Sequence, residues 1–274
     1  MPKERLDVLL VKQNLIETRE KAKRMIMAGL VFTGTERLDK PGMKVDVSIP
    51  LSVKGTIPYV SRGGFKLEKA LTTFNTSVLD KIMVDIGAST GGFTDCALQN
   101  GASLIYAIDV GYNQLAWKLR NDERVIVKER TNFRHVTKDF FTEGLPNFAT
   151  IDVSFISLKI ILPVLKNILQ HRSEVITLIK PQFEAEREQV GKKGIIRDQK
   201  IHEQVLRKII TFAEDEGFNV LNLTHSPITG GEGNIEFLAH LEWNTDDGKQ
   251  QMKFEQEQIK SIIEQAHEQL KKGN

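Results

Sequence analysis

The sequence contains almost no cysteine and no long apolar run, and these two features exclude disulfide-rich secreted proteins and membrane-spanning proteins. Cys96 is the only cysteine in 274 residues, so an internal disulfide is excluded, and no metal-type Cys/His cluster occurs. No stretch approaches the ~18 apolar residues that a membrane helix requires. The N-terminal segment MPKERLDVLL also lacks the apolar core of a secretory signal. We therefore expect a soluble, cytoplasmic protein without a bound metal.

A large excess of charge of one sign is also absent, but the charge is unevenly distributed. The whole chain has a formal net charge of +2. Residues 1–60 contain 11 Lys/Arg against 7 Asp/Glu, a net charge of +4, and the remaining residues contain 27 against 29, a net charge of −2. The local basic excess favours an anionic partner for the N-terminal part of the chain.

The N-terminal sixty residues read as a small α/β module. From Arg5 to about Leu30 the apolar residues recur at helical spacing, which predicts two short helices, the second capped by Thr18 and closed by Gly29. The following stretch LVFTGTERLDKPGMKVDVSI alternates apolar residues with turn signals and predicts short strands. The segment LSVKGTIPYVSRGG is the expected linker, so we place the domain boundary between residues 60 and 61.

Residues 61–274 predict a doubly wound, Rossmann-like sheet. Short apolar runs alternate with helical segments. The seven predicted strands are residues 82–87, 103–109, 124–129, 149–155, 174–180, 219–226 and 234–243. Only PITGGEG separates the last two, which leaves no room for a crossover helix. We therefore expect a parallel sheet whose last strand is antiparallel.

A glycine-rich turn, VDIGASTGGFTD (residues 84–95), follows the first of these strands. Its glycines do not have the Gly-x-Gly-x-x-Gly spacing of nicotinamide-binding turns, and the chain has no Gly-x-x-x-x-Gly-Lys-[Ser/Thr] loop for nucleoside triphosphates. Asp85, placed before the turn, would repel a pyrophosphate but attract a cationic amino group or sulfonium. Glycines that merely permit a tight turn are the alternative interpretation.

Two further polar residues extend this candidate cofactor site. Asp109 ends the next strand, where a carboxylate can accept hydrogen bonds from both ribose hydroxyls. Asn132, beside Phe133, is placed to hydrogen-bond an adenine edge. Together these residues favour S-adenosylmethionine over NAD or ATP. The predicted cofactor-binding residues are Asp85, Gly87, Ser89, Gly91, Asp109 and Asn132.

The end of the fourth strand bears on the methyl acceptor. Enzymes that methylate exocyclic amines commonly have Asn/Asp-Pro-Pro-aromatic there, whereas this chain has Asp152-Val153-Ser154-Phe155. Methylation at carbon 5 of a base needs a cysteine nucleophile, and Cys96 is expected to face the core. An oxygen acceptor remains, and its proton must be taken by a well-placed base.

Four charged residues are predicted to meet at one edge of the sheet. Lys180 ends the fifth strand, Lys66 lies in SRGGFKLEKAL before the first strand, and Glu236 begins the last strand. With Asp152 they supply a lysine base and the carboxylates to orient it. Four unrelated surface charges are the alternative interpretation.

This quartet, the turn DIGASTGGFTD and the segment SRGGFKLEKAL resemble the FtsJ-like (RrmJ) ribose 2'-O-methyltransferases. The N-terminal RLDVLL…TREKAKRMIMAGLVF resembles an S4 RNA-binding domain, and the combination is similar to the TlyA family, often labelled hemolysin A. The resemblance implies S-adenosylmethionine as cofactor and ribosomal RNA or ribosomal subunits as partner. It also implies Lys180 as general base, Asp152 and Glu236 as orienting carboxylates, and Lys66 as a substrate-positioning residue.

The S4 resemblance directs attention to cations on the two predicted helices. Arg5, Arg19, Lys23 and Arg24 are placed to meet RNA phosphates, with ordinary helix-surface charge as the alternative. Two other functions stay open from the sequence. One is a membrane-lytic protein, as the hemolysin label suggests, and the other is a ribosome-associated RNA-binding protein with a silent methyltransferase domain.

Overall fold

The computed structural model describes residues 2–27, 29–55, 58–230, 233–244 and 254–271. The chain divides into two compact units, Met1–Arg62 and Gly63–Asn274. Within the described residues, none of the helices combines the length and the apolar content needed to cross a membrane.

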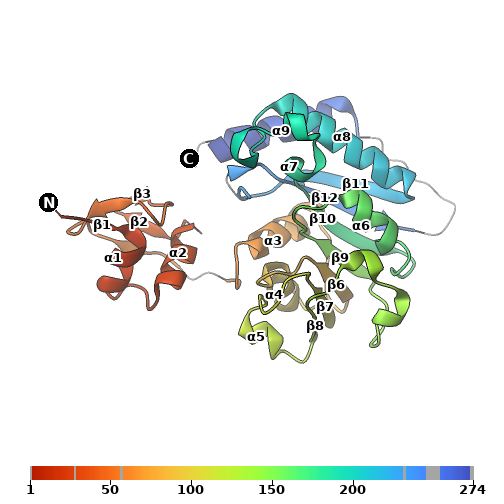
Figure 1. Cartoon of the computed structure of the whole chain (residues 1–274), viewed down its shortest axis with the longest axis horizontal. Coiled ribbons are helices and arrows are strands. Elements are labelled where there is room, and N and C mark those ends of the chain that lie inside the picture. Colours follow the sequence, from red (N-terminus) through yellow and green to blue (C-terminus); the bar gives the residue numbers. More distant parts are fainter. Residues whose placement is uncertain (1, 28, 56–57, 231–232, 245–253, 272–274) are drawn as a thin grey trace. The chain divides into compact units, whose positions relative to one another are not determined.

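The described residues of the N-terminal unit form two short helices and five short strands (Figure 1). The helices are α1 (Leu6–Lys12) and α2 (Arg19–Met27), and the strands are β1 (Lys3–Arg5), β2 (Val31–Thr33), β3 (Glu36–Arg37), β4 (Lys44–Asp46) and β5 (Ser52–Val53). Strand β1 pairs with β4, and β2 lies between β3 and β5. The two predicted helices are confirmed, and Thr18 Oγ1 accepts a hydrogen bond from the Lys21 amide at 3.2 Å, as an N-cap does.

The apolar residues of α1 and α2 form the core of this unit. Leu6 and Leu10 from α1 and Ile26 from α2 are fully buried, together with Val31 of β2. Because these residues face inward at helical spacing, the polar residues of both helices are left at least partly exposed, with the exception of the buried Asp7.

The C-terminal unit is built on a seven-stranded sheet with the order β11-β12-β10-β9-β6-β7-β8 (Figure 1). The strands are β6 (Ile82–Ile86), β7 (Leu104–Ile108), β8 (Val125–Lys128), β9 (Phe148–Ile151), β10 (Ser173–Ile179), β11 (Phe218–His225) and β12 (Phe237–Trp243). Strand β12 is antiparallel to both β10 and β11, whereas the other pairs are parallel. The predicted fold class is therefore confirmed, and the last two strands pair as an antiparallel hairpin at one edge of the sheet, with β12 inserted between β10 and β11.

Helices cover the sheet and complete the core. They are α3 (Gly63–Phe74), α4 (Gly92–Gln99), α5 (Trp117–Arg120), α6 (Leu158–Leu165), α7 (Pro181–Glu184), α8 (Gln199–Asp215) and α9 (Gln256–Lys271), with short 3₁₀ turns at η1 (Phe133–His135), η2 (Lys138–Phe140), η3 (Arg187–Gln189) and η4 (Lys192–Gly194). Helices α6, α8 and α9 share one hydrophobic cluster with the strands, while α3 packs against α4, β11 and β12.

The register of the strands decides which residues meet at the edge of the sheet. Ile86 is paired with Ile108 on one side and with Ile151 on the other. Gly87, Asp109 and Asp152 therefore each follow the last paired residue of a neighbouring strand. Strand order reverses between β6 and β9, and such a reversal is where open α/β sheets bind ligands.

Candidate active site

A cavity of about 450 Å³ lies at this edge of the sheet. Its size is in the range of small-molecule sites, roughly 300 to 1,000 Å³. Segments that follow β6, β7 and β9 form its walls together with η1. The lining residues include Gly87, Ser89, Asp109, Val110, Gln114, Asn132, Phe133, Asp152, Ser154, Phe155 and Ile161. The cavity therefore combines apolar walls with a few polar groups.

The glycine turn brings two strand ends close together. Gly87 has a φ of +83°, and a Cβ on it would lie 2.6 Å from the backbone oxygen of Asp152. A side chain at residue 87 would therefore clash with the segment that carries the candidate acceptor site. Gly91 has a φ of +95° and would clash with Leu115 and Leu119 instead. Both glycines allow close packing, and Gly87 lines the cavity. Gly91, which was also predicted to bind the cofactor, does not line the cavity but packs against Leu115 and Leu119.

Asp109 has the geometry expected for binding a ribose. Its Oδ2 accepts a hydrogen bond from the Ser89 amide at 2.8 Å, and its Oδ1 accepts one from the Gly111 amide at 2.7 Å. Each carboxylate oxygen can accept more than one hydrogen bond, so capacity remains for two hydroxyl groups. The two amides hold the carboxylate at the cavity wall.

Asn132 and Phe133 lie at the far wall of the same cavity. Asn132 Oδ1 accepts a hydrogen bond from the Arg134 amide at 3.1 Å, which orients its side-chain amide. Phe133 is 3% exposed and belongs to the hydrophobic cluster of the sheet. An oriented amide beside an apolar wall suits an adenine, so the cavity residues fit the predicted S-adenosylmethionine.

Asp85 is placed differently from the prediction. Its side chain is buried at 1% exposure and does not line the cavity. Its Oδ2 accepts hydrogen bonds from the amide of Thr94 at 3.1 Å and from the hydroxyl of Thr94 at 2.6 Å, and its Oδ1 accepts one from Thr150 at 2.8 Å. The structure thus corrects the expectation of direct cofactor contact, because Asp85 ties the start of α4 to β9 beneath the turn.

Burial makes Asp85 a source of pH-dependent stability. Burial raises its pKa to about 6, although the hydrogen bonds from Thr94 and Thr150 act in the opposite direction. An acidic group whose pKa is higher in the folded than in the unfolded protein stabilises the fold when it is protonated. This contribution is complete below the pKa of the unfolded protein and is lost as the pH rises through the pKa of the folded protein. The ionised carboxylate therefore destabilises the folded protein at neutral pH.

Asp85→Asn is expected to become more stable relative to the parent as the pH rises. Asparagine can accept from Thr94 and donate to Thr150 without carrying a charge. The difference in free energy of unfolding should move in favour of the variant by up to about 3 kcal/mol between about pH 4 and pH 7. Urea denaturation across this range measures it, with exposed Asp139→Asn as control, and a difference that does not change with pH would refute the expectation.

The four predicted charged residues lie together in one ion-pair chain. Lys180 Nζ is 2.5 Å from Asp152 Oδ1, Lys66 Nζ is 3.7 Å from Asp152 Oδ2, and Lys66 Nζ is 2.6 Å from Glu236 Oε2. Lys66, Lys180 and Glu236 are buried, while the side chain of Asp152 keeps 21% exposure. Two lysines therefore alternate with two carboxylates in a chain that reaches the cavity at Asp152.

The lysines control the charge of Asp152. Burial alone would raise the pKa of Asp152, but the charges of Lys66 and Lys180 outweigh it and bring the pKa below its ordinary value. Lys180 Nζ also donates to Ser154 Oγ at 3.1 Å. The side-chain nitrogen of Lys180 is thus held by two oxygens, one of which belongs to an ionised carboxylate.

Several residues at or near this site were not predicted from the sequence. Ser154 and Phe155 line the cavity, and Phe155 has a φ of +63° with its ring 90% exposed. Glu184 accepts from the Ser157 hydroxyl at 2.6 Å and from the Leu158 amide at 2.8 Å, so it joins α7 to the start of α6. Burial raises the pKa of Glu184. Only the position of Ser154, two residues after Asp152, offered a signal in the sequence.

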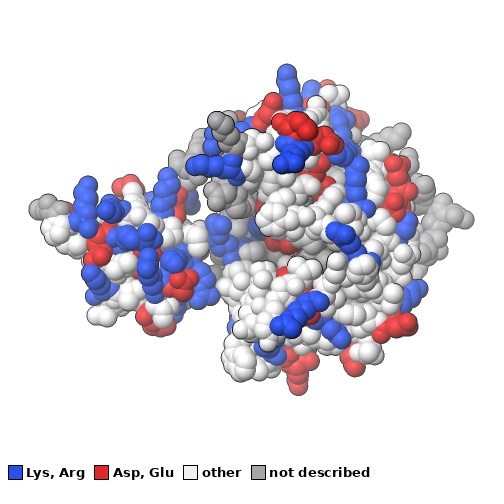
Figure 2. Space-filling view, in the orientation of Figure 1, with Lys and Arg blue, Asp and Glu red and all other residues white. Residues whose placement is uncertain are grey.

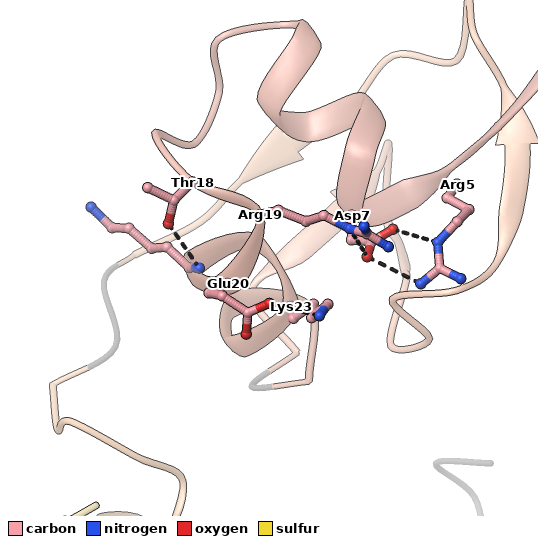
Figure 3. Close-up of polar contacts among 7 residues, drawn as sticks. Arg5, Asp7, Thr18, Arg19, Glu20 and Lys23 are labelled. Carbon is pink, nitrogen blue, oxygen red and sulfur yellow. Dashed lines mark hydrogen bonds and ion pairs between the residues drawn. The ribbon is translucent and has the colours of Figure 1, made fainter. Parts of the chain in front are cut away.

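The predicted RNA-binding cations lie in the N-terminal unit. Figure 2 shows Lys and Arg side chains over much of its visible face. Arg5 and Arg19 both bond to Asp7, and Lys23 Nζ donates to Glu20 at 2.7 Å (Figure 3). Arg24 makes a longer contact, 3.4 Å from its Nη1 to the Val60 oxygen. The four cations are therefore in different settings, and two of them share one carboxylate.

Comparison with family models agrees with this arrangement. The model of the FtsJ-like methyltransferase family matches residues 59–243, and the model of the S4 domain matches residues 4–48. The first match covers the seven-stranded sheet with its cavity, and the second covers both helices of the N-terminal unit.

Individual proteins are similar over nearly the whole chain. The candidate rRNA methyltransferase YqxC of Bacillus subtilis is 63% identical over 270 residues, which are 98% of this chain and 96% of YqxC. The 16S/23S rRNA (cytidine-2'-O)-methyltransferase TlyA of Mycobacterium tuberculosis is 38% identical over 244 residues, 88% of this chain and 91% of TlyA. A solved structure of a candidate hemolysin from Streptococcus thermophilus is 57% identical, with a TM-score of 0.77 and coverage of 100% and 98%.

Proposed function

Because the chain belongs to the FtsJ-like methyltransferase family and carries an S4 domain, we propose that it methylates ribose 2'-hydroxyls of ribosomal RNA with S-adenosylmethionine. In this proposal residues 1–60 form the S4 domain and dock the enzyme on structured RNA. Residues 61–274 form the methyltransferase domain that holds the cofactor and the acceptor nucleotide.

The ion-pair chain that reaches the cavity at Asp152 carries the proposal. Lys180 is 2.5 Å from Asp152, and Asp152 itself lines the cavity, which supports a position of the lysine amine beside the proposed acceptor hydroxyl. A ribose hydroxyl is a weak nucleophile whose proton must leave during transfer. In the proposed mechanism the neutral amine form of Lys180 takes this proton and becomes an ammonium group beside Asp152. Asp152 orients Lys180, and the ion pair of Lys66 with Glu236 lies next to Asp152.

The chain's own residues would hold the cofactor at the strand ends. Asp109 binds the ribose hydroxyls, Asn132 and Phe133 bind the adenine, and the Gly87 turn allows the backbone to approach closely. The cofactor supplies the activated methyl group, so the protein's task is alignment and removal of one proton. Gly91 and Asp85 support the turn from below, and Ser89 holds Asp109 through its amide.

The choice of RNA as substrate rests on the S4 domain and on the names of the relatives. The TlyA of Mycobacterium tuberculosis is named for methylation of cytidine in 16S and 23S rRNA, and YqxC is named as a candidate rRNA methyltransferase. We propose the same substrate class for this chain, with cytidine as the acceptor nucleotide.

Incubation of the purified full chain with S-adenosylmethionine labelled in its methyl group is expected to label ribosomal RNA. The label should lie on ribose oxygens, because a 2'-O-methyl group protects the adjacent phosphodiester bond from alkaline hydrolysis. Transcripts of 16S and 23S rRNA and isolated ribosomal subunits serve as substrates, and mapping of protected bonds identifies the nucleotide.

Two results would contradict the proposal. Label on base atoms would exclude a ribose acceptor, and cofactor binding without transfer to any of these substrates would indicate a silent RNA-binding protein. Release of dye from liposomes by the purified chain would support the membrane-lytic alternative that the name of the Streptococcus thermophilus protein suggests.

A further inference from the structure

We propose that Asp7 is a positioning residue for RNA docking, which orients the guanidinium groups of Arg5 and Arg19 toward RNA phosphates. The inference rests on the proposed function, since it assumes that the S4 domain binds RNA. Arg5 ends β1 and Arg19 begins α2, so the two arginines come from different elements. Asp7, in the first turn of α1, is the residue that joins them.

The contacts of Asp7 fix both guanidinium groups (Figure 3). Arg5 Nε donates to Oδ1 at 3.0 Å and Arg5 Nη2 donates to Oδ2 at 3.1 Å, a two-pronged contact that sets the plane of the group. Arg19 Nε donates to Oδ2 at 2.8 Å. Because both arginines share Oδ2, their positive charges are held next to each other.

Asp7 is anchored in the fold rather than on the surface. Its side chain is 0% exposed, and its amide donates to the Pro41 oxygen at 3.1 Å. The hydrogen bond from Arg5, opposed by burial and helped by Arg19, lowers the pKa of Asp7 to about 2. The carboxylate is therefore ionised at neutral pH and lies behind the arginines, where it does not meet an RNA backbone directly.

The arginines keep most of their donors for a ligand. A guanidinium has five N–H donors, of which the contacts with Asp7 use two in Arg5 and one in Arg19. Their side chains are 44% and 50% exposed. The planar guanidinium groups present oriented N–H donors that match the oxygens of a phosphate. Because Asp7 already holds these groups in place, less conformational entropy is lost when RNA binds.

Other ion pairs of this unit lack these properties. Lys21 pairs with Glu17, and Lys23 pairs with Glu20, but these glutamates are 79% and 78% exposed. Exposed pairs of this kind, between residues three or four positions apart in the sequence, contribute little to stability. Asp7 differs because a fully buried carboxylate organises two cations from separate elements.

Asp7→Asn changes the RNA affinity in opposite directions if Asp7 acts only through its charge and if it positions the two arginines. Removal of a negative charge from a basic surface strengthens RNA binding if charge alone matters. If Asp7 positions the arginines, the variant should bind in vitro transcribed 16S and 23S rRNA about tenfold more weakly, with a salt dependence reduced by about one phosphate contact. Glu17→Gln removes one charge from the same unit and should bind equally or more tightly.

Kinetics and a second variant separate positioning from folding. Asp7→Asn should raise the KM for RNA while kcat at saturating RNA stays unchanged, because the methyltransferase unit is intact. If Asp7→Asn does not fold, as judged by circular dichroism, Arg19→Lys decides the question. It keeps the charge but loses the planar fork, and it should lose affinity as well.

The outcomes distinguish this inference from the proposed function. Wild-type protein that methylates rRNA, together with an Asp7→Asn variant of equal or higher affinity, overturns the role of Asp7 alone. An Arg19→Lys variant that binds rRNA as tightly as the wild type also overturns the role of Asp7 alone. If the wild-type protein binds rRNA without methylating it, the proposed function is overturned, and the affinities of the variants still decide the role of Asp7. If the wild-type protein does not bind rRNA, both the proposed function and the role of Asp7 are overturned.

Discussion

Replacement of Lys180 by methionine is expected to lower the rate of methyl transfer by about 10²- to 10⁴-fold, the usual contribution of a general base. Methionine is of similar length but carries no amine, so the acceptor proton has no residue to receive it. Cofactor binding should persist, because Lys180 contacts Asp152 and Ser154 and is not among the residues that line the cavity. Single-turnover transfer of labelled methyl and equilibrium dialysis of the cofactor measure the two quantities.

Lys180→Arg tests whether Lys180 acts as a base or only as a cation. Arginine keeps the positive charge beside Asp152 but is not deprotonated in proteins. A base role predicts that the arginine variant is as slow as the methionine variant, whereas a purely electrostatic role predicts substantial activity. Lys200→Met, at an exposed position of α8, is the matched control. Activity of Lys180→Met equal to that of this control would reject Lys180 as the base.

Glu236→Gln is expected to destabilise the methyltransferase unit by about 3 kcal/mol, since it leaves a buried charge without its main partner. Glu236 is 2% exposed, and its Oε2 is 2.6 Å from Lys66 Nζ, which is also buried. The effect lies at the lower end of the range for such pairs because Asp152 remains 3.7 Å from Lys66. Urea denaturation of the full chain measures the change in free energy of unfolding.

A double-mutant cycle supplies the control for this prediction. Lys66→Met removes the other charge, and the double variant Lys66→Met/Glu236→Gln should be less destabilised than the sum of the two single variants. The double variant should nevertheless have low methyl-transfer activity, because Asp152 has lost one of the two cations beside it. Additive effects on stability would show that Lys66 and Glu236 do not act as a pair.

Much of the fold was accessible from sequence because its signals are local. Each of the seven strands is a short apolar run that ends within a few residues of its predicted bounds, as β7 (Leu104–Ile108) does within residues 103–109. The short connection PITGGEG predicted the antiparallel pairing of the last two strands. The insertion of strand β12 between β10 and β11 was not predicted, because the pairing partners of a strand depend on contacts between distant parts of the chain.

The candidate site was only partly accessible for the same reason. Asp109, Gly87 and Asn132, which were predicted to bind the cofactor, line one cavity, because each directly follows a strand or a turn at the sheet edge. Asp85 was assigned to the cofactor on chemical grounds, yet the alternation of side chains and the nearby Thr94 and Thr150 direct it inward. A sequence states that a carboxylate is present, but not which polar groups satisfy it.

By itself the sequence determined the class of the fold, the type of cofactor and the residue types of the site, because periodicity and turn chemistry act over a few neighbouring residues. Only the tertiary structure decided which of the four charged residues pair with one another. Lys66 and Glu236 are separated by 170 positions and lie 2.6 Å apart, because the antiparallel β12 begins at the edge where the parallel strands end. Whether a charged side chain faces solvent, lines the cavity or forms a buried ion pair depends on how deeply it is buried. Burial is a property of the folded chain and not of the local sequence.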